Sequence, residues 1–362
     1  MVRNKNAIAH IINGQWSNVI ANCNTYQLRM LHAVRSCRTS ALGGQLYQCN
    51  SCCRHHIRYN SCRNRHCPQC QNTQKERWIL ARQAQLIDTT YYHVVFTIPH
   101  VLNSLCKSNQ RIMYACLLRS TWDTLNTFGW NKKYLGAQIG ATTVLHTWGS
   151  NLSYHPHVHC MVPGGGVTLK NKWKQVKGNG KYLFNAKAMS IVFRAKYIAA
   201  ITKAGILIPQ KLKHDLYKKP WVVYAKPSYG NRETLIKYLA RYAYKTAITH
   251  HRIISYSERS VSFKYKDYRH KNLIKIMTLS SWEFVRRFTQ HILPKGFCRI
   301  RHYGILNGSW KSKIFTNASV KKKDWKEIWE DKGLEINKCP HCKKGILILK
   351  EEIQPKRGPP CK

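Results

Sequence analysis

The sequence predicts an α+β fold: a largely antiparallel central sheet flanked by helices, with a metal-dependent segment near the N-terminus. Runs of β-forming residues lie between amphipathic helical stretches, but they do not alternate as regular βαβ units do. Residues 37–71 are rich in Cys, Asn and Arg and have no hydrophobic period of their own. A segment of that kind would not pack without a metal ion.

The first elements follow from hydrophobic spacing. Residues 1–35 carry apolar positions at roughly helical spacing, namely Ile8, Ile11, Ile12, Val19, Ile20, Leu28 and Leu31. A helix is expected again over 74–87. The β-former run at 91–98 is closed by Pro99 and is predicted as a strand.

The remaining elements follow the same rules. Helices are expected at 101–128, 185–204, 231–248 and 281–292, and strands at 141–148, 156–162, 221–224, 252–257 and 260–266. Asn231 is a suitable N-cap, with Glu233 in the first turn of its helix. We therefore predict a helical and zinc-binding domain over 1–88, a main domain over 89–310 and a basic tail over 311–362.

The charge of the chain points to a polyanionic partner. It has 61 Lys+Arg against 15 Asp+Glu, a formal net charge of +46. Nucleic acid is the expected partner, because each neutralised phosphate releases a counterion and strengthens binding. A basic structural protein of the ribosomal type and a membrane-surface binder are the alternatives. No Asp or Glu lies between Asp123 and Asp215, so a nuclease built on carboxylate ligands is not expected there.

The compartment follows from the cysteines. The sequence shows no signal peptide and no apolar run long enough to span a membrane. In a large basic chain, closely spaced cysteines are typical of zinc sites and not of disulfides, which predicts a reducing cytoplasm.

Two Cys-x-x-Cys pairs lie in the metal-dependent segment. Cys49 with Cys52 and Cys67 with Cys70 are separated by fourteen residues, which is typical of a tetrahedral zinc site. Further candidate ligands are Cys37, Cys62 and His66, for a second zinc or in place of one of these four, and Cys53 and His55 could compete. Cys339 and Cys342 form a third pair, but no obvious partner pair follows them.

The segment His155-Pro156-His157-Val158-His159 lies where a strand is expected. On a strand, residues two apart project to the same side, so His157 and His159 point together. Two imidazoles on one sheet face can hold a divalent ion and leave positions open for a phosphate oxygen. A zinc site or ordinary surface histidines are the alternatives.

Two tyrosines lie one helical turn apart. Tyr238 and Tyr242 are at i and i+4 of the expected helix, and Lys245 is expected on the same face. Two phenols and an ammonium group can then line one side. A phenol is a weak nucleophile at its ordinary pKa near 10, and neighbouring cations help it. Packing of an amphipathic core helix is the alternative.

Taken together, these motifs resemble the two-tyrosine HUH transposases of the insertion sequence ninety-one type. The zinc-domain resemblance rests on Cys37-Arg38-Thr39, Leu42-Gly43-Gly44 and the run from Tyr59 to Gln71. The resemblance of the body rests on Phe96-Thr97-Ile98-Pro99-His100, His146-Thr147-Trp148-Gly149, His155 to His159, Pro163-Gly164-Gly165-Gly166 and Tyr238-Leu239-Ala240-Arg241-Tyr242. Two departures are Cys53, where Gly is expected, and Lys245, where Arg is usual.

The resemblance implies an HUH endonuclease core and a mechanism. His157 and His159 would hold Mg²⁺ or Mn²⁺, with His146 or His155 as third ligand, and one or two Zn²⁺ ions would be structural. Tyr238 or Tyr242 would attack a phosphate of single-stranded DNA at transposon ends and targets, forming a 5′-phosphotyrosine in rolling-circle-like transposition. Lys245 or Arg241 would stabilise the developing charge. A bacterial, nucleoid-associated location is expected, with the protein acting as a monomer or dimer.

Two other functions compete with this hypothesis. A plasmid or phage-type replication initiator or relaxase uses the same chemistry, although the N-terminal zinc module and the lack of a G-x-x-x-x-G-K-S/T phosphate loop favour a transposase. A non-catalytic, zinc-containing nucleic-acid-binding protein would not need the tyrosines at all.

Overall fold

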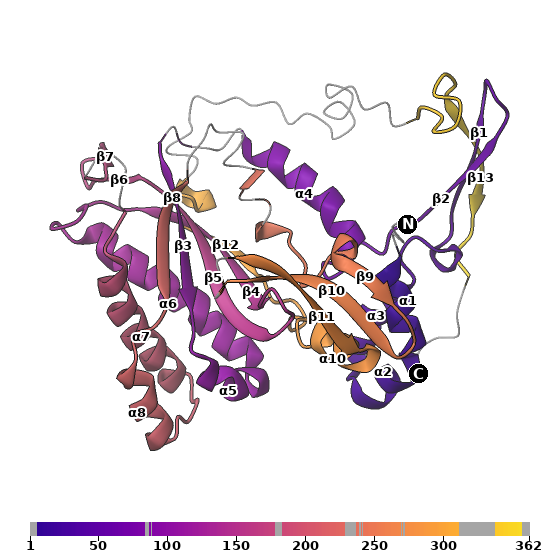
Figure 1. The fold of residues 1–362 in the computed structure, drawn as a ribbon. Coiled ribbons are helices and arrows are strands. Elements are labelled where there is room, and N and C mark those ends of the chain that lie inside the picture. The colour runs from indigo at the N-terminus through magenta and orange to yellow at the C-terminus, as the bar shows by residue number, and fades with distance from the viewer. Residues whose placement is uncertain are drawn as a thin grey trace. The chain divides into compact units, whose positions relative to one another are not determined.

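The computed structural model contains two compact units. One comprises Met1–Leu80, Tyr244–Ile292 and Lys321–Lys362, and the other comprises Ala81–Ala243 and Leu293–Val320. We call them the cysteine unit and the histidine unit after their clusters. Figure 1 traces the chain through both. Within these ranges the structure describes residues 6–83, 87, 89–177, 183–228, 237, 238, 240, 242–268, 270, 272–310 and 337–356.

The histidine unit is built on a five-stranded sheet in which every neighbouring pair is antiparallel. The strand order is β12-β4-β5-β3-β8. The strands are β3 (Tyr91–Thr97), β4 (Gly140–Trp148), β5 (Tyr154–Pro163), β8 (Val223–Ser228) and β12 (Ile300–Gly304). The predicted α+β class with a largely antiparallel sheet is confirmed.

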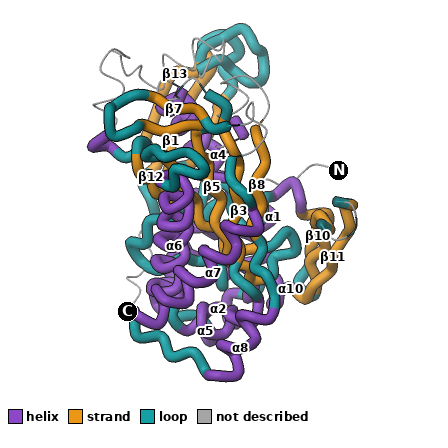
Figure 2. Tube along the Cα trace, turned by 90° about the vertical axis from the view of Figure 1, so that its left-hand side faces the viewer, coloured by secondary structure: helices purple, strands orange, loops and turns teal. Residues whose placement is uncertain are grey.

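Helices pack on one face of this sheet. They are η2 (His100–Leu102), α5 (Asn103–Ser108), α6 (Gln110–Trp130), α7 (Ala186–Lys203) and α8 (Gln210–Lys218). Figures 1 and 2 both show α6 and α7 alongside the strands. Leu117 and Phe193 from these helices share one buried core with Phe96 and Val158 of the sheet. A small two-stranded sheet, β6 (Gly165–Val167) with β7 (Trp173–Gln175), lies in the same unit.

The expected strand at 221–224 begins later and runs further than the sequence indicated. β8 includes Pro227, which was expected to end the strand. It is an edge strand, paired only with β3 in the described sheet. Proline lacks an amide proton, so a strand can carry it at the edge without losing a bond to a second neighbour.

Helices and a three-stranded sheet form one part of the cysteine unit. They are α1 (Ala7–Gly14), α2 (Trp16–Asn22), α3 (Thr25–Arg35), α10 (Ser281–Thr289), β9 (Ile253–Tyr256), β10 (Ser260–Asp267) and β11 (Leu273–Ser280), with a short η3 (His250–Arg252). The helical region predicted over 1–35 is divided at Gln15 and again at Cys23 and Asn24. Asn24 forms a capping box with Gln27, which starts α3. The predicted hairpin is confirmed as β9 and β10, and β11 was not foreseen.

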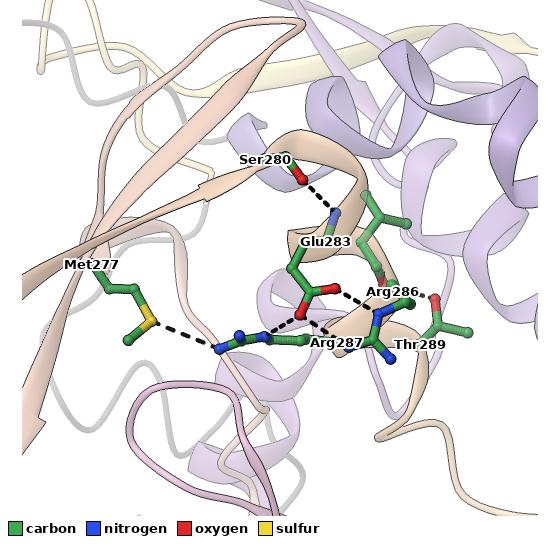
Figure 3. A network of polar contacts seen from close by, with 7 residues as sticks. Met277, Ser280, Glu283, Arg286, Arg287 and Thr289 are labelled. Atoms are coloured by element: carbon green, nitrogen blue, oxygen red, sulfur yellow. Dashed lines mark hydrogen bonds and ion pairs between the residues drawn. The ribbon is translucent and has the colours of Figure 1, made fainter.

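Glu283 takes part in a network of polar contacts at the start of α10, as Figure 3 shows. The Ser280 hydroxyl accepts a hydrogen bond from the Glu283 amide at 3.2 Å and caps the helix. The Glu283 carboxylate accepts hydrogen bonds from Arg286 and Arg287. These contacts, with Arg286 the strongest, lower the pKa of Glu283 to about 2. One carboxylate thus offsets the charge of two guanidinium groups.

Another three-stranded sheet of the cysteine unit pairs a strand from the C-terminal region with an N-terminal hairpin. Its strand order is β13-β1-β2, formed by β1 (Gly44–Cys49), β2 (His55–Tyr59) and β13 (Leu347–Ile353). A short η1 (Ser40–Leu42) precedes it and α4 (Pro68–Gln83) follows β2. Residues 337–356, expected to belong to a basic tail, therefore contribute a strand that pairs with the N-terminal hairpin. None of the helices that the structure describes is long and apolar enough to span a membrane.

Candidate functional site

The central strands of the histidine unit gather three histidines on the face opposite the core. His146 on β4 lies directly across from His157 on β5. His159 follows two residues later and so projects to the same side. The intervening Val158 is fully buried in the core on the other side. Strand register therefore brings together His146, His157 and His159, which we call the histidine triad.

The triad fits a divalent metal ion. One nitrogen of each ring lies within 4.8 Å of the others, and Nε2 of His157 is 3.1 Å from Nε2 of His159. Two nitrogens bound at about 2.1 Å to one ion are about 3 Å apart. His146 and His159 are buried, and His157 is part-buried. The Nδ1–H of His157 can donate to the carbonyl oxygen of His155 at 2.7 Å, which leaves a lone pair on Nε2 for a metal.

The structure separates the two candidates for the third ligand. His146 belongs to the triad, whereas the His155 side chain does not. His146 is identified as the third ligand by its register against His157, which the sequence alone does not give.

His93 on β3 is a site residue that the sequence analysis missed. Its Nε2 lies 2.8 Å from Nδ1 of His159, and its Nδ1 lies 2.8 Å from the phenol oxygen of Tyr238. Burial lowers the pKa of His93 to about 4, so the ring is neutral near pH 7. His93 therefore links the triad to a tyrosine through two hydrogen bonds.

Both tyrosines lie at this site. Tyr242 donates a hydrogen bond to the phenol oxygen of Tyr238 at 3.2 Å. The ring of Tyr242 is 4.2 Å from that of His159, measured between centroids. Nε2 of His146 lies 2.7 Å from the backbone carbonyl of Tyr242. The i, i+4 spacing thus places both phenols beside the triad.

The structure does not place the two expected cations, Arg241 and Lys245, on the helix face beside the tyrosines. Arg241 lies outside the described residues, as do 231–236 and 239 of the expected helix. The described helical residues end at Ala243, so the expectation that this helix runs to 248 with Lys245 on its face is wrong. Residue 244 forms a turn, and Lys245 is exposed beyond it in the cysteine unit.

The cysteines form two quartets in the cysteine unit. The first, which we call the local quartet, contains Cys37, Cys62, Cys67 and Cys70. The Sγ atoms of Cys37 and Cys62 lie 3.6 and 3.5 Å from Sγ of Cys70. Four sulfurs at 2.3 Å from a tetrahedral zinc ion are about 3.8 Å apart, so the local quartet fits Zn²⁺.

The second, which we call the split quartet, contains Cys49, Cys52, Cys339 and Cys342. The predicted sharing of one ion by the pairs Cys49/Cys52 and Cys67/Cys70 is therefore wrong. The turn after β1 faces the C-terminal pair. Cys67 directly before α4 and Cys70 in its first turn lie with Cys37 and Cys62 instead. His66, Cys53 and His55 belong to neither quartet.

Comparison with known proteins agrees with these clusters. A family described as "Transposase zinc-binding domain", of the IS91 type, matches residues 10–98, and one described as "Putative transposase" matches residues 140–313. The chain is 35% identical to the putative transposase y4qJ of Sinorhizobium fredii over 93% of this chain and 92% of that protein. It is 30% identical to the transposase for insertion sequence element IS801 of Pseudomonas savastanoi pv. phaseolicola, over 75% of this chain and 68% of that protein.

The chain belongs to the IS91 family of transposases. DNA is therefore its partner and DNA transposition its activity, which favours the transposase over the replication initiator or relaxase and the non-catalytic binder. The zinc-binding match covers the local quartet and His93, and the second match covers the triad and both tyrosines. Cys339 and Cys342 lie outside both matched ranges. No solved structure matches this IS91-family chain.

Proposed function

We propose that the protein nicks and rejoins single-stranded DNA through 5′-phosphotyrosine intermediates, as an HUH endonuclease, in rolling-circle-like transposition. The observation that carries this proposal is the hydrogen-bonded series of Tyr242, Tyr238, His93 and His159, which joins two phenols to a potential metal site. A packing role alone would not require these phenols to reach the only group of three histidines among the described residues that could hold a metal ion.

His146, His157 and His159 would hold the catalytic ion, Mg²⁺ or Mn²⁺. Three nitrogen donors favour Mn²⁺, because Mg²⁺ prefers oxygen ligands. When bound, the ion would polarise the scissile phosphate and offset charge that develops on it. Three protein ligands leave further positions open for phosphate oxygens.

The hydrogen bonds favour Tyr238 as the first nucleophile. If Nε2 of His159 faces the ion, the proton of its neutral ring is on Nδ1 and donates to Nε2 of His93. Neutral His93 then carries its own proton on Nδ1 and donates to the phenol oxygen of Tyr238. Tyr242 donates to the same oxygen. Two hydrogen-bond donors stabilise negative charge on the phenol oxygen, which favours Tyr238 as the nucleophile.

The reaction conserves the phosphodiester bond energy. The phenol oxygen attacks phosphorus, the bond to the 3′ oxygen breaks, and the phenol proton passes by way of solvent to the 3′-hydroxyl that is released. Attack by a 3′-hydroxyl on the phosphotyrosine reverses the step and joins strands at a new place without ATP. With two tyrosines one protein can hold two cut ends. Arg241, between the two tyrosines in the sequence, is proposed to stabilise the phosphorane charge.

The substrates are proposed to be single strands at transposon ends and at targets. The +46 charge fits binding along a phosphate backbone, and the exposed aromatic Tyr59 with Arg58 on β2 fits contact with phosphates and unpaired bases. A bacterial cytoplasm, in association with the nucleoid, is the proposed location.

The proposal is tested by trapping the covalent intermediate. Wild-type protein with Mn²⁺ and single-stranded DNA carrying the element's end should give a protein–DNA adduct that survives denaturation. The double variant Tyr238→Phe/Tyr242→Phe should bind the DNA and give none. No adduct from the wild type, or an undiminished adduct from the double variant, contradicts the proposal.

A further inference from the structure

The two turns that carry the split quartet are built alike. In each, a Cys-x-x-Cys pair is followed by a residue with left-handed backbone, Cys53 at φ 56° and Lys343 at φ 56°. The amide of Cys53 donates to the carbonyl of Cys49 at 3.1 Å, and that of Lys343 donates to the carbonyl of Cys339 at 3.0 Å. Glycine adopts this backbone most easily, which explains why Gly was expected at 53.

Backbone amides point at the sulfurs of both turns. The amides of Ser51 and Cys52 donate to Sγ of Cys49, each at 3.4 Å. The amide of Gly345 donates to Sγ of Cys342 at 3.3 Å. Amide donors favour a thiolate over a thiol, and thiolates are the form that binds metal.

The distances across the two turns suit a tetrahedral ion and exclude disulfides. Sγ of Cys49 is 3.7 Å from Sγ of Cys342, and Sγ of Cys52 is 3.8 Å from Sγ of Cys339. Sulfurs around a tetrahedral zinc ion are about 3.8 Å apart, whereas a disulfide bond is about 2.05 Å long.

The sheet that joins the two turns has little apolar core of its own. Its buried cluster consists of Cys49, Cys339 and Leu347, with Tyr47, Cys52 and Cys342 packed beside them. Ile57, Ile348 and Leu349 of the same sheet are 46–50% exposed. A three-stranded sheet without a buried apolar face is only marginally stable in water, so a further stabilising interaction is needed.

We propose that the split quartet is a second structural zinc site, which fastens the C-terminal segment 337–353 to the β1–β2 hairpin. Each turn supplies two thiolates, and the ion replaces the missing core of the β13-β1-β2 sheet. Four thiolates and Zn²⁺ carry a charge of −2, and cationic side chains on the two turns, including Arg54, Lys343 and Lys344, offset it. Arg54 also bonds the opposite turn through Nδ1 of His341 at 3.3 Å.

Metal content tests this proposal directly. Purified full-length protein should contain two zinc ions per chain by mass spectrometry of its metals, and Cys339→Ser/Cys342→Ser should contain one. The matched control Cys53→Ser removes an exposed cysteine beside the quartet and should keep two. One zinc in the wild type, or two in the Cys339→Ser/Cys342→Ser variant, overturns the proposal.

Alkylation of the wild type gives an answer even if the variant does not fold. In zinc-loaded protein Cys339 and Cys342 should resist alkylation, while the exposed Cys53 and Cys298 react. A chelator should make Cys339 and Cys342 reactive together with Cys49. Equal reactivity of Cys339 and Cys53 in the loaded protein contradicts a metal site.

Gly345 offers a graded variant. A Cβ at Gly345 would lie 2.5 Å from Sγ of Cys49, so Gly345→Ala must displace that sulfur or the turn. We expect a chelator to remove zinc from the split quartet at a chelator concentration roughly ten- to a hundredfold lower than in wild type. Zinc in the local quartet should be unaffected. Gly14→Ala, where a Cβ would meet nothing within 4 Å, should leave both ions unchanged. Identical zinc retention in Gly345→Ala and Gly14→Ala contradicts the proposal.

Discussion

The cysteine quartets and the histidine triad are both clusters of metal ligands, yet they are organised for different tasks. Each quartet offers four sulfurs, which complete a tetrahedron and leave no position for a substrate. The triad offers three nitrogens and leaves positions open. The number of ligands, more than the distances between them, therefore distinguishes a metal site that supports folding from one that can support chemistry.

The two kinds of cluster also differ in what lies behind them. The split quartet is at the end of a thin sheet with exposed apolar residues. The triad lies on the inner strands β4 and β5, backed by a core that includes Leu145 and Val158. A rigid backing holds ligands and phenols in fixed geometry, as catalysis requires.

Removal of one ligand from each kind of cluster should separate chemistry from folding. His157→Ala should lower DNA cleavage by about three orders of magnitude, because metal polarisation of a phosphate contributes several kcal/mol, and should keep zinc content and thermal stability. Cys67→Ser should instead lose one zinc and melt the cysteine unit at lower temperature, because structural zinc contributes to folding free energy. Cleavage assays, metal analysis and calorimetry measure the three quantities.

His155→Ala is the matched control for the triad, because His155 lies on the same strand but outside the cluster. Its cleavage rate should stay within a few-fold of wild type. If His155→Ala is as inactive as His157→Ala, or if His157→Ala loses zinc, the division of roles between the two kinds of cluster is wrong.

A smaller effect is expected from His93, which supports the triad without belonging to it. His93→Ala removes the partner of His159 Nδ1 and a hydrogen bond to Tyr238. Loss of such a partner costs about 10–100-fold in activity or metal affinity. The rate of adduct formation should fall to that extent. The preference for Tyr238 over Tyr242 should also be lost, which is measured by comparing the adduct rates of His93→Ala in the Tyr238→Phe and Tyr242→Phe backgrounds. An unchanged preference would show that His93 does not prepare Tyr238.

The sequence predicted those features of the site that depend on local spacing. His157 and His159 share a face because strand residues alternate, and Tyr238 meets Tyr242 because helix residues four apart are neighbours. Features that depend on long-range pairing were missed. Neither the register of β3 against β5, which brings His93 to His159, nor the pairing of Cys49 with Cys342 leaves a signal in local sequence. The same limit explains the wrong division of the cysteine pairs.

The most direct test is to identify the residue that carries the DNA. Protein, Mn²⁺ and single-stranded end DNA should be mixed for one turnover, then digested with protease and nuclease, and the nucleotide-linked peptide sequenced by mass spectrometry. We predict a phosphodiester to Tyr238, with Tyr242 modified when Tyr238 is Phe, and no linkage in His157→Ala. A linkage to a residue other than these tyrosines, or one that forms equally in His157→Ala, would contradict the account.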